Sequence, residues 1–128
     1  MPTSEQIRAT IGQYVERFSA ADKDGWLQLF SSDAKVEDPV GDDAHIGTEA
    51  IAAFWDTSRT LADAITLVPT GPVRVAGVEA AFPMQAVTAI GDDQLVVDII
   101  DVMTFDDDCC ITSNRAFWDP TEIRPYEG

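Results

Sequence analysis

The hydrophobic pattern near the start of the chain is that of an amphipathic helix. Its apolar residues recur at intervals of three and four positions, as one face of a helix requires. They are Ile7, Ile11, Tyr14, Val15 and Phe18. Thr3 and Gln6 lie just before this stripe and resemble a capping box, which predicts that the helix begins there. Tyr14 lies on the buried stripe, where its hydroxyl either finds a partner in the core or donates into a cavity.

Two shorter helices are expected to follow. Asp22 or Asp24 can cap the first, which carries Trp26, Leu27, Leu29 and Phe30. Thr48 is expected to cap the other, whose inward face consists of Ile51, Phe54, Trp55 and Ser58.

Between these helices, residues 34–39 read as a short strand. Alternation places Ala34, Val36 and Asp38 on its inner side. Pro39 removes a ladder donor and keeps Asp38 extended, so the strand should end with this carboxylate at its tip. An ordinary turn aspartate would also fit here, but the alternation directs Asp38 inward.

From residue 64 onward the pattern changes to strands separated by turn residues. The predicted strands are 64–69, 73–75, 78–90, 94–105 and 109–118, with a bulge or unpaired position at Pro83. Helices followed by meandering strands predict an α+β domain whose curved sheet wraps around the helices. We expect a single domain over residues 1–128, with only the tail after about residue 119 loosely held.

An acidic residue interrupts the apolar alternation of the strand 94–105. One face of this strand carries Val97, Ile99, Asp101, Met103 and Phe105. An isolated carboxylate cannot stay ionised in such a row, so the pKa of Asp101 should rise and its neutral form should donate a hydrogen bond. A strand end or pairing with a basic side chain would be the alternative explanation.

The opposite face of the same strand is also mostly apolar. This outer face carries Ile100 and Val102, and the last strand adds Phe117 to it. Since the helices can cover only one face, a homodimer through the other face is expected.

Composition limits the possible ligands. The net charge is −15, which disfavours nucleic acid and anionic lipid and favours an uncharged or cationic ligand. No apolar run approaches the ~18 residues of a membrane-spanning helix, and no signal-peptide pattern opens the chain, so a cytoplasmic protein is predicted. Cys109 and Cys110 are adjacent and His45 is the single histidine, which predicts neither a disulfide framework nor a metal site.

Several of these segments together resemble the bacterial Δ5-3-ketosteroid isomerases. The resemblance runs from about Ser4 to Trp118, and its most specific part is the run Val-Glu-Asp-Pro-Val-Gly at 36–41. Three further segments also match: Gln13-Tyr14-Val15, Gly47-Thr48 with Ile51 and Phe54, and Val96-Val97 followed by Ile100-Asp101. The resemblance implies the nuclear transport factor 2-like, or cystatin-like, fold, a cone-shaped curved mixed sheet around three helices. Because many activities share that fold, it does not specify the reaction by itself.

The resemblance also implies roles for three residues. Asp38 would be the general base that moves a proton from C4 to C6 of a 3-oxo-Δ5-steroid. Tyr14 and neutral Asp101 would form the oxyanion hole for the C3 oxygen. Acids with separately tuned pKa values are an established feature of that family. On the charge states, the residues themselves support one inference only, that the inward position of Asp101 requires a neutral acid. No cofactor is implied.

The remaining pocket should be apolar, to receive a small flat steroid. Candidate substrate-binding residues, from alternation and the resemblance, are Phe54, Trp55, Phe82, Met84, Val97, Met103, Asn114 and Trp118. Core packing alone would explain most of them equally well. The chain departs from the family at three positions: Phe30 and Trp55 stand where supporting tyrosines are common, and Asn114 stands where an apolar wall residue is expected.

Two other classes of function fit parts of the pattern. A polyketide cyclase or epoxide hydrolase could use the same scaffold. An epoxide hydrolase would need an Asp-Arg-Asp arrangement around a water, and only Arg74 and Arg115 lie in the predicted strands; alternation places Arg115 on the opposite face from Asn114. A non-catalytic module that binds a hydrophobic ligand has no reason to combine a base, a phenol and a buried acid.

Overall fold

The computed structural model describes residues 1–60 and 62–127. The helices are α1 (Ser4–Ser19), α2 (Lys23–Leu27), α3 (Thr48–Ser58) and the 3-10 helix η1 (Pro120–Glu122). The strands are β1 (Phe30–Glu37), β2 (His45–Ile46), β3 (Ala64–Pro69), β4 (Arg74–Ala76), β5 (Glu79–Ile90), β6 (Asp93–Phe105), β7 (Ile111–Phe117) and β8 (Arg124–Pro125).

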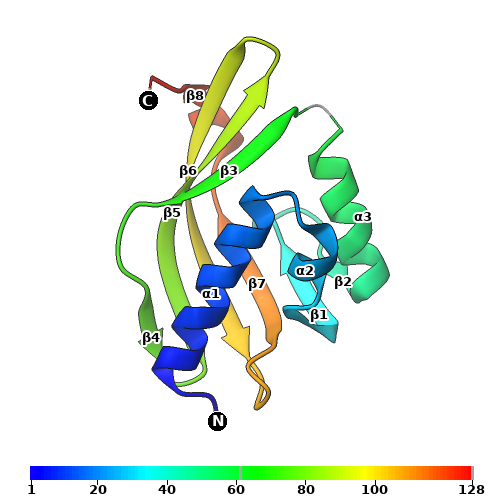
Figure 1. The fold of residues 1–128 in the computed structure, drawn as a ribbon, viewed down its shortest axis with the longest axis vertical. Helices are drawn as coiled ribbons and strands as arrows, with labels where there is room; N and C mark the ends of the chain where they lie inside the picture. Colours follow the sequence, from blue (N-terminus) through cyan, green and yellow to red (C-terminus); the bar gives the residue numbers. More distant parts are fainter. Residues whose placement is uncertain (61, 128) are drawn as a thin grey trace.

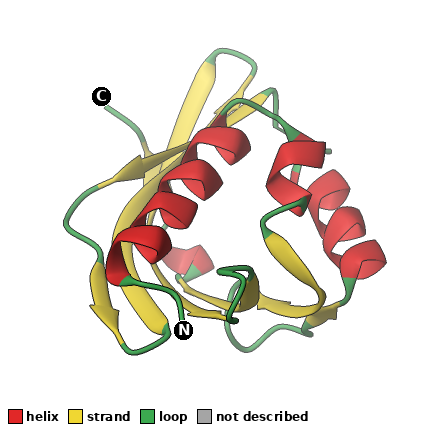
Figure 2. Ribbon diagram, turned by 60° about the horizontal axis from the view of Figure 1, so that its bottom comes forward, coloured by secondary structure: helices red, strands yellow, loops and turns green. Residues whose placement is uncertain are grey.

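These strands form one curved mixed sheet that packs against the helices. Its order is β2-β1-β7-β6-β5-β3, with β4 added to β5 and β8 to β6. The pairing of β1 with β7 is parallel, and every other pairing of named strands is antiparallel. In Figures 1 and 2, α1 crosses the sheet near β3 and β4, while α3 flanks it beside β1 and β2. The α+β prediction is therefore confirmed.

Helix α1 joins the core along the stripe predicted from its sequence. Thr3 and Gln6 form the reciprocal capping box that opens it. Tyr14 and Phe18 then pack against the aromatic rings of Trp26, Phe30 and Trp55, with centroids 5.1–6.2 Å apart. This aromatic cluster fixes the helix against α2, α3 and the start of β1.

The central strand β6 has the alternation that the sequence predicted. Its inner residues are all buried: Val97, Ile99, Asp101, Met103 and Phe105. Strand β5 covers one edge of it and β7 the other, without a register shift next to Asp101. Asp101 therefore lies in the middle of a sheet, and the alternative that it marks a strand end is wrong.

Some local expectations differ from the structure. The second helix ends at Leu27, so Leu29 and Phe30 do not belong to it, and Phe30 begins β1. The N-cap of α3 is Gly47, at φ 90, and no side chain caps it, because Thr48 is already the first helical residue. The tail contributes η1 and the strand β8, which pairs with Leu95 and Val96.

At Pro83 a bulge or an unpaired position was expected, and the structure shows the second of these. The β5–β6 register passes through the pair Pro83 and Ile100 without interruption, so there is no bulge. On the other edge of β5, pairing with β3 ends at Met84 and pairing with β4 begins at Ala81. Pro83 thus lies between two partner strands, where its missing N–H breaks no ladder hydrogen bond.

An apolar patch on the outer face of the sheet generates the first testable prediction. Ile100 and Phe117 are cross-strand partners and are 50% and 42% exposed. The Arg115 guanidinium lies 5.2 Å from the Phe117 ring centroid and borders the patch. We propose that a second copy of the chain covers this face.

Light scattering coupled to gel filtration should therefore give twice the chain mass of 13.9 kDa. Ile100→Glu should shift the protein to the monomer. The new carboxylate would be desolvated in the dimer interface and repelled by the same carboxylate of the second copy. Ile90→Glu, on an exposed residue at the β5–β6 turn, is the matched control and should stay dimeric. A monomeric wild-type protein at micromolar concentration would contradict the proposal.

Candidate active site

Asp101 is the most unusual side chain of the core. It is 1% exposed, and neither carboxyl oxygen has a hydrogen-bond partner among the described residues. Burial, followed by the charge of Asp38, raises the pKa of Asp101 well above its ordinary value, and the Asn114 amide lowers it by a smaller amount. Burial without a counter-charge therefore favours the neutral form of this carboxyl group, which can donate a hydrogen bond. Among the described residues, no arginine forms an ion pair with it.

Helix α1 brings Tyr14 to the same region. The phenol is 4% exposed, and its oxygen accepts a hydrogen bond of 3.3 Å from Nδ2 of Asn114. Burial raises the pKa of Tyr14 well above 10, and the charges of Asp101 and Asp38 add to this effect, while Trp26 and Asn114 oppose it. The phenol therefore keeps its proton at neutral pH, so it too is a donor.

The parallel pairing of β1 with β7 determines the position of Asp38. Val36 lies opposite Asn114, so the residues just beyond each strand, Asp38 and Trp118, reach the same end of the sheet. The Trp118 indole N–H donates a 2.6 Å hydrogen bond to Asp38 Oδ1. Burial raises the pKa of Asp38 to about 6, the Trp118 hydrogen bond opposes this rise, and Asp42 adds to it. At pH 7 this carboxyl group is therefore mostly ionised.

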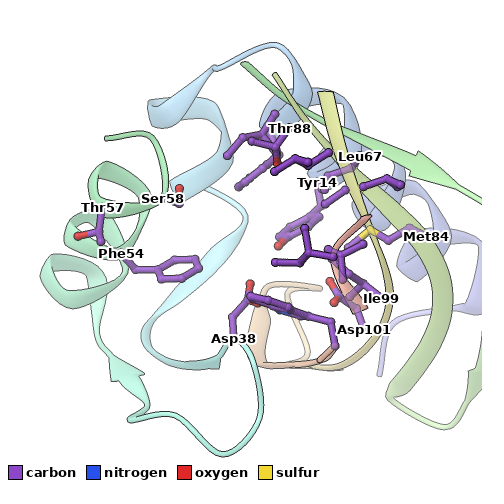
Figure 3. A pocket seen from close by; sticks show the side chains of 18 of the residues that line it. Tyr14, Asp38, Phe54, Thr57, Ser58, Leu67, Met84, Thr88, Ile99 and Asp101 are labelled. Atoms are coloured by element: carbon purple, nitrogen blue, oxygen red, sulfur yellow. The ribbon is translucent and has the colours of Figure 1, made fainter. Parts of the chain in front are cut away.

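These three groups border one cavity of about 420 Å³. Figure 3 shows Tyr14, Asp38 and Asp101 gathered at one part of it, with Phe54 and Ser58 of α3 on the far side. Almost all other wall residues are apolar, contributed by α1, α3 and strands β3, β5 and β6. The cavity is within the size range of small-molecule sites and combines an apolar wall with few polar groups.

The candidate substrate-binding residues fall into two groups. Phe54, Met84, Val97 and Trp118 line the cavity. Trp55, Phe82 and Met103 are buried in the core behind the wall, and Asn114 lies behind it as the partner of Tyr14. Trp55 packs against Phe18 and Trp26, so its ring is already enclosed by other aromatic rings.

Several wall residues were not singled out from the sequence. They include Phe18, Ile65, Leu67, Leu95, Ile99 and Ile123. The alternation of β6 already placed Ile99 beside Asp101, and that signal could have identified it. Ile65 and Leu67 depend on the pairing of β3 with β5, and Ile123 on the folding of the tail, which no local pattern reveals.

The arrangement combines a carboxylate with two neutral oxygen donors in an apolar cavity. A carboxylate with a pKa near 6 can remove a proton from a weak carbon acid, and two O–H donors can hold the oxygen on which the charge then develops. Within the described residues, no group of three histidine, cysteine or acidic side chains could hold a metal ion. Likewise, no helix in the described ranges is long and apolar enough to cross a membrane.

Comparison with known families agrees with the fold and the cavity. Residues 11–113 match the model of the SnoaL-like domain, and the chain belongs to this family. The steroid Delta-isomerase of Nocardioides simplex is 38% identical over 120 residues, which cover 94% of this chain and 95% of that protein. The resemblance noted from the sequence is thus confirmed at the level of the family and of this relative.

Solved structures support the fold alone, because their identities are low. The epoxide hydrolase/cyclase-like enzyme SalBIII, studied for pyran ring formation in the polyether salinomycin, superimposes with a TM-score of 0.88 at 23% identity. The superposition covers 98% of this chain and 100% of the SalBIII chain. RV0760c of Mycobacterium tuberculosis gives a TM-score of 0.86 at 21% identity, with the same coverage.

The unpartnered carboxyl group of Asp101 predicts a measurable effect on stability. Its pKa is raised in the folded state, so folding at neutral pH requires uptake of a proton, and stability falls as pH rises above the ordinary aspartate pKa. Asp101→Leu removes this penalty and should stabilise the protein by about 2 kcal/mol at pH 7. The gain should shrink toward pH 4.

Urea denaturation at both pH values measures this difference. Asp98→Leu is the matched control, since Asp98 lies on the outer face of the same strand and pairs with Arg124. It should give no gain at pH 7. A wild-type protein more stable than Asp101→Leu at pH 7 would show that the carboxyl group has a stabilising partner.

Proposed function

We propose that the protein is a steroid Δ-isomerase that converts 3-oxo-Δ5-steroids into conjugated 3-oxo-Δ4-steroids. The observation that carries the proposal is the meeting of an ionised Asp38 with two neutral donors, Tyr14 and Asp101, at one cavity. The relative from Nocardioides simplex, named a steroid Delta-isomerase, supports it. The size and apolar wall of the cavity suit a flat, uncharged ring system.

In the proposed reaction, Asp38 removes a proton from C4. The C4–H electron pair delocalises through C3 onto the ketone oxygen, which gives a dienolate. The O–H groups of Tyr14 and Asp101 hold this oxygen while it carries the charge, and no metal is needed. Protonated Asp38 then returns the same proton to C6, and the double bond moves into conjugation. One carboxyl group at the rim of the steroid face can reach both carbons.

The two carboxyl groups must differ in charge for this reaction, and their surroundings provide the difference. Asp38 has a hydrogen bond from Trp118, which stabilises its ionised form. Asp101 has no comparable donor, so its neutral form dominates. The proton is therefore taken by one acid and the oxyanion is held by the other.

The alternative enzyme classes gain less support from the cavity. No arginine is among the described residues that line it. Arg115 points to the outer face, where it lies 3.4 Å from Glu37 and over the ring of Phe117. An Asp-Arg-Asp arrangement around a water molecule is therefore not available to Asp38 and Asp101. The cytoplasmic location expected from the sequence stays a prediction.

Incubation with 5-androstene-3,17-dione tests the proposal directly. The conjugated enone product absorbs in the ultraviolet, so its formation can be followed continuously. We expect conversion far above a buffer blank. Absence of conversion at high enzyme concentration would end the isomerase proposal.

Two substitutions should separate the roles of the acids. Asp38→Asn should lower kcat by at least about 10³-fold with little change in steroid affinity, because only the base is lost. Asp101→Leu should lower kcat by about 10²-fold, since Tyr14 still donates. Steady-state kinetics and competition binding with the product measure both. Equal losses of affinity with unchanged turnover would assign the two residues to binding.

The pH dependence should report the pKa of Asp38. Since the base must be ionised, kcat/KM should rise with pH through about 6 and level off above it. Asp42→Asn should move this midpoint downward, because Asp42 raises the pKa of Asp38 through its charge. Asp43→Asn, in the same exposed loop, is the control and should leave the midpoint in place. A profile flat between pH 5 and 8 would exclude Asp38 as the base.

A further inference from the structure

Asn114 is a polar residue in an apolar environment that the proposed reaction does not use. It is 1% exposed and lies in β7, between Val36 of β1 and Met103 of β6. It does not belong to the cavity wall. Burying an amide in this way costs free energy unless its groups are hydrogen-bonded, and Oδ1 of Asn114 has no partner among the described residues. Its one hydrogen bond therefore calls for an explanation.

That hydrogen bond goes to the phenol of Tyr14. Nδ2 of Asn114 donates to the Tyr14 oxygen at 3.3 Å. The phenol oxygen is thus an acceptor toward the sheet, and its own proton remains available for an acceptor elsewhere. Three aromatic rings also pack around the phenol, those of Phe18, Trp26 and Phe30, with centroids 5.9–6.3 Å from the Tyr14 ring.

Asn114 also lies close to the second donor. Asp101 pairs with Ala116 and Met103 pairs with Asn114, so Asp101 and Asn114 are diagonal neighbours on the inner face of β6 and β7. The amide thus lies where Tyr14 of the helix layer meets Asp101 of the sheet layer.

We propose that Asn114 is a positioning residue for the oxyanion hole: by donating to the Tyr14 oxygen, it holds the phenol in place and directs the phenol proton into the cavity. The proposal rests on the isomerase function for its catalytic consequence, but not for the contact itself. As negative charge develops on a ligand oxygen, the Tyr14 O–H is drawn toward it and the phenol oxygen becomes a stronger acceptor. The Asn114 N–H then stabilises the charged state more than the ground state.

The contact can be tested by fluorine NMR, because the chain contains only two tyrosines, Tyr14 and Tyr126. Both are replaced by a ring-fluorinated tyrosine chosen so that the buried phenol titrates while the protein stays folded. Asn114→Leu should raise the titration midpoint of the Tyr14 signal by about one pH unit, since it removes a donor to the phenolate. The Tyr126 signal serves as the internal reference.

A matched control comes from the same strand. Thr112→Val removes the hydroxyl that donates to the Thr104 carbonyl oxygen, without touching Tyr14. It should leave the Tyr14 midpoint unchanged. In the isomerase assay, Asn114→Leu should lower kcat about tenfold while KM changes less than about threefold, and Thr112→Val should change neither.

An unchanged Tyr14 midpoint in folded Asn114→Leu would overturn the proposal. If that variant does not fold, the NMR signal of the Asn114 side-chain amide is compared between the wild-type protein and Tyr14→Phe. The signal should shift when the Tyr14 hydroxyl is removed, and an unchanged signal would overturn the proposal. A wild-type protein that does not isomerise steroids would refute the proposed function. A raised midpoint would then still support the contact.

Discussion

The structure depends on one unfavourable feature, a carboxyl group buried in the sheet without a counter-charge. Asp101 lies on the inner face of β6 between Ile99 and Met103, and neither of its oxygens has a partner among the described residues. Because a charge is costly there, the group is retained as a neutral acid. A neutral acid at a cavity wall can donate a hydrogen bond to an acceptor on a bound ligand. This donor distinguishes the cavity from a purely apolar pocket.

The topology supplies the other two groups from distant parts of the chain. Helix α1 carries Tyr14 over the sheet, and the parallel pairing of β1 with β7 brings Asp38 next to Trp118. The same sheet therefore gives one acid a hydrogen bond that favours its ionised form and leaves the other without one. In this way one fold holds two carboxyl groups in different charge states.

Much of this arrangement could be predicted from local patterns. Strict alternation in β6 was sufficient to place Asp101 inward, and the capping box with its apolar stripe placed Tyr14 on the inner face of α1. What could not be predicted depends on register between strands. The Trp118 hydrogen bond to Asp38 and the Asn114 hydrogen bond to Tyr14 join residues 80 and 100 positions apart. Alternation shows which face of the sheet a side chain is on, but not whether it reaches the cavity or is buried in the core behind it. Phe82 and Met103 could therefore not be distinguished from residues that line the cavity.

The central claim is that the oxygens of Tyr14 and Asp101 converge on a single ligand atom. A crystal structure with a bound planar phenol of steroid-like shape tests it most directly. The ligand oxygen should lie within hydrogen-bond distance of both Tyr14 Oη and an Asp101 carboxyl oxygen, with the carboxylate of Asp38 over the ring face. A ligand whose oxygen contacts neither of the two, or points instead toward Ser58 and Thr88 on the other side of the cavity, would contradict the claim.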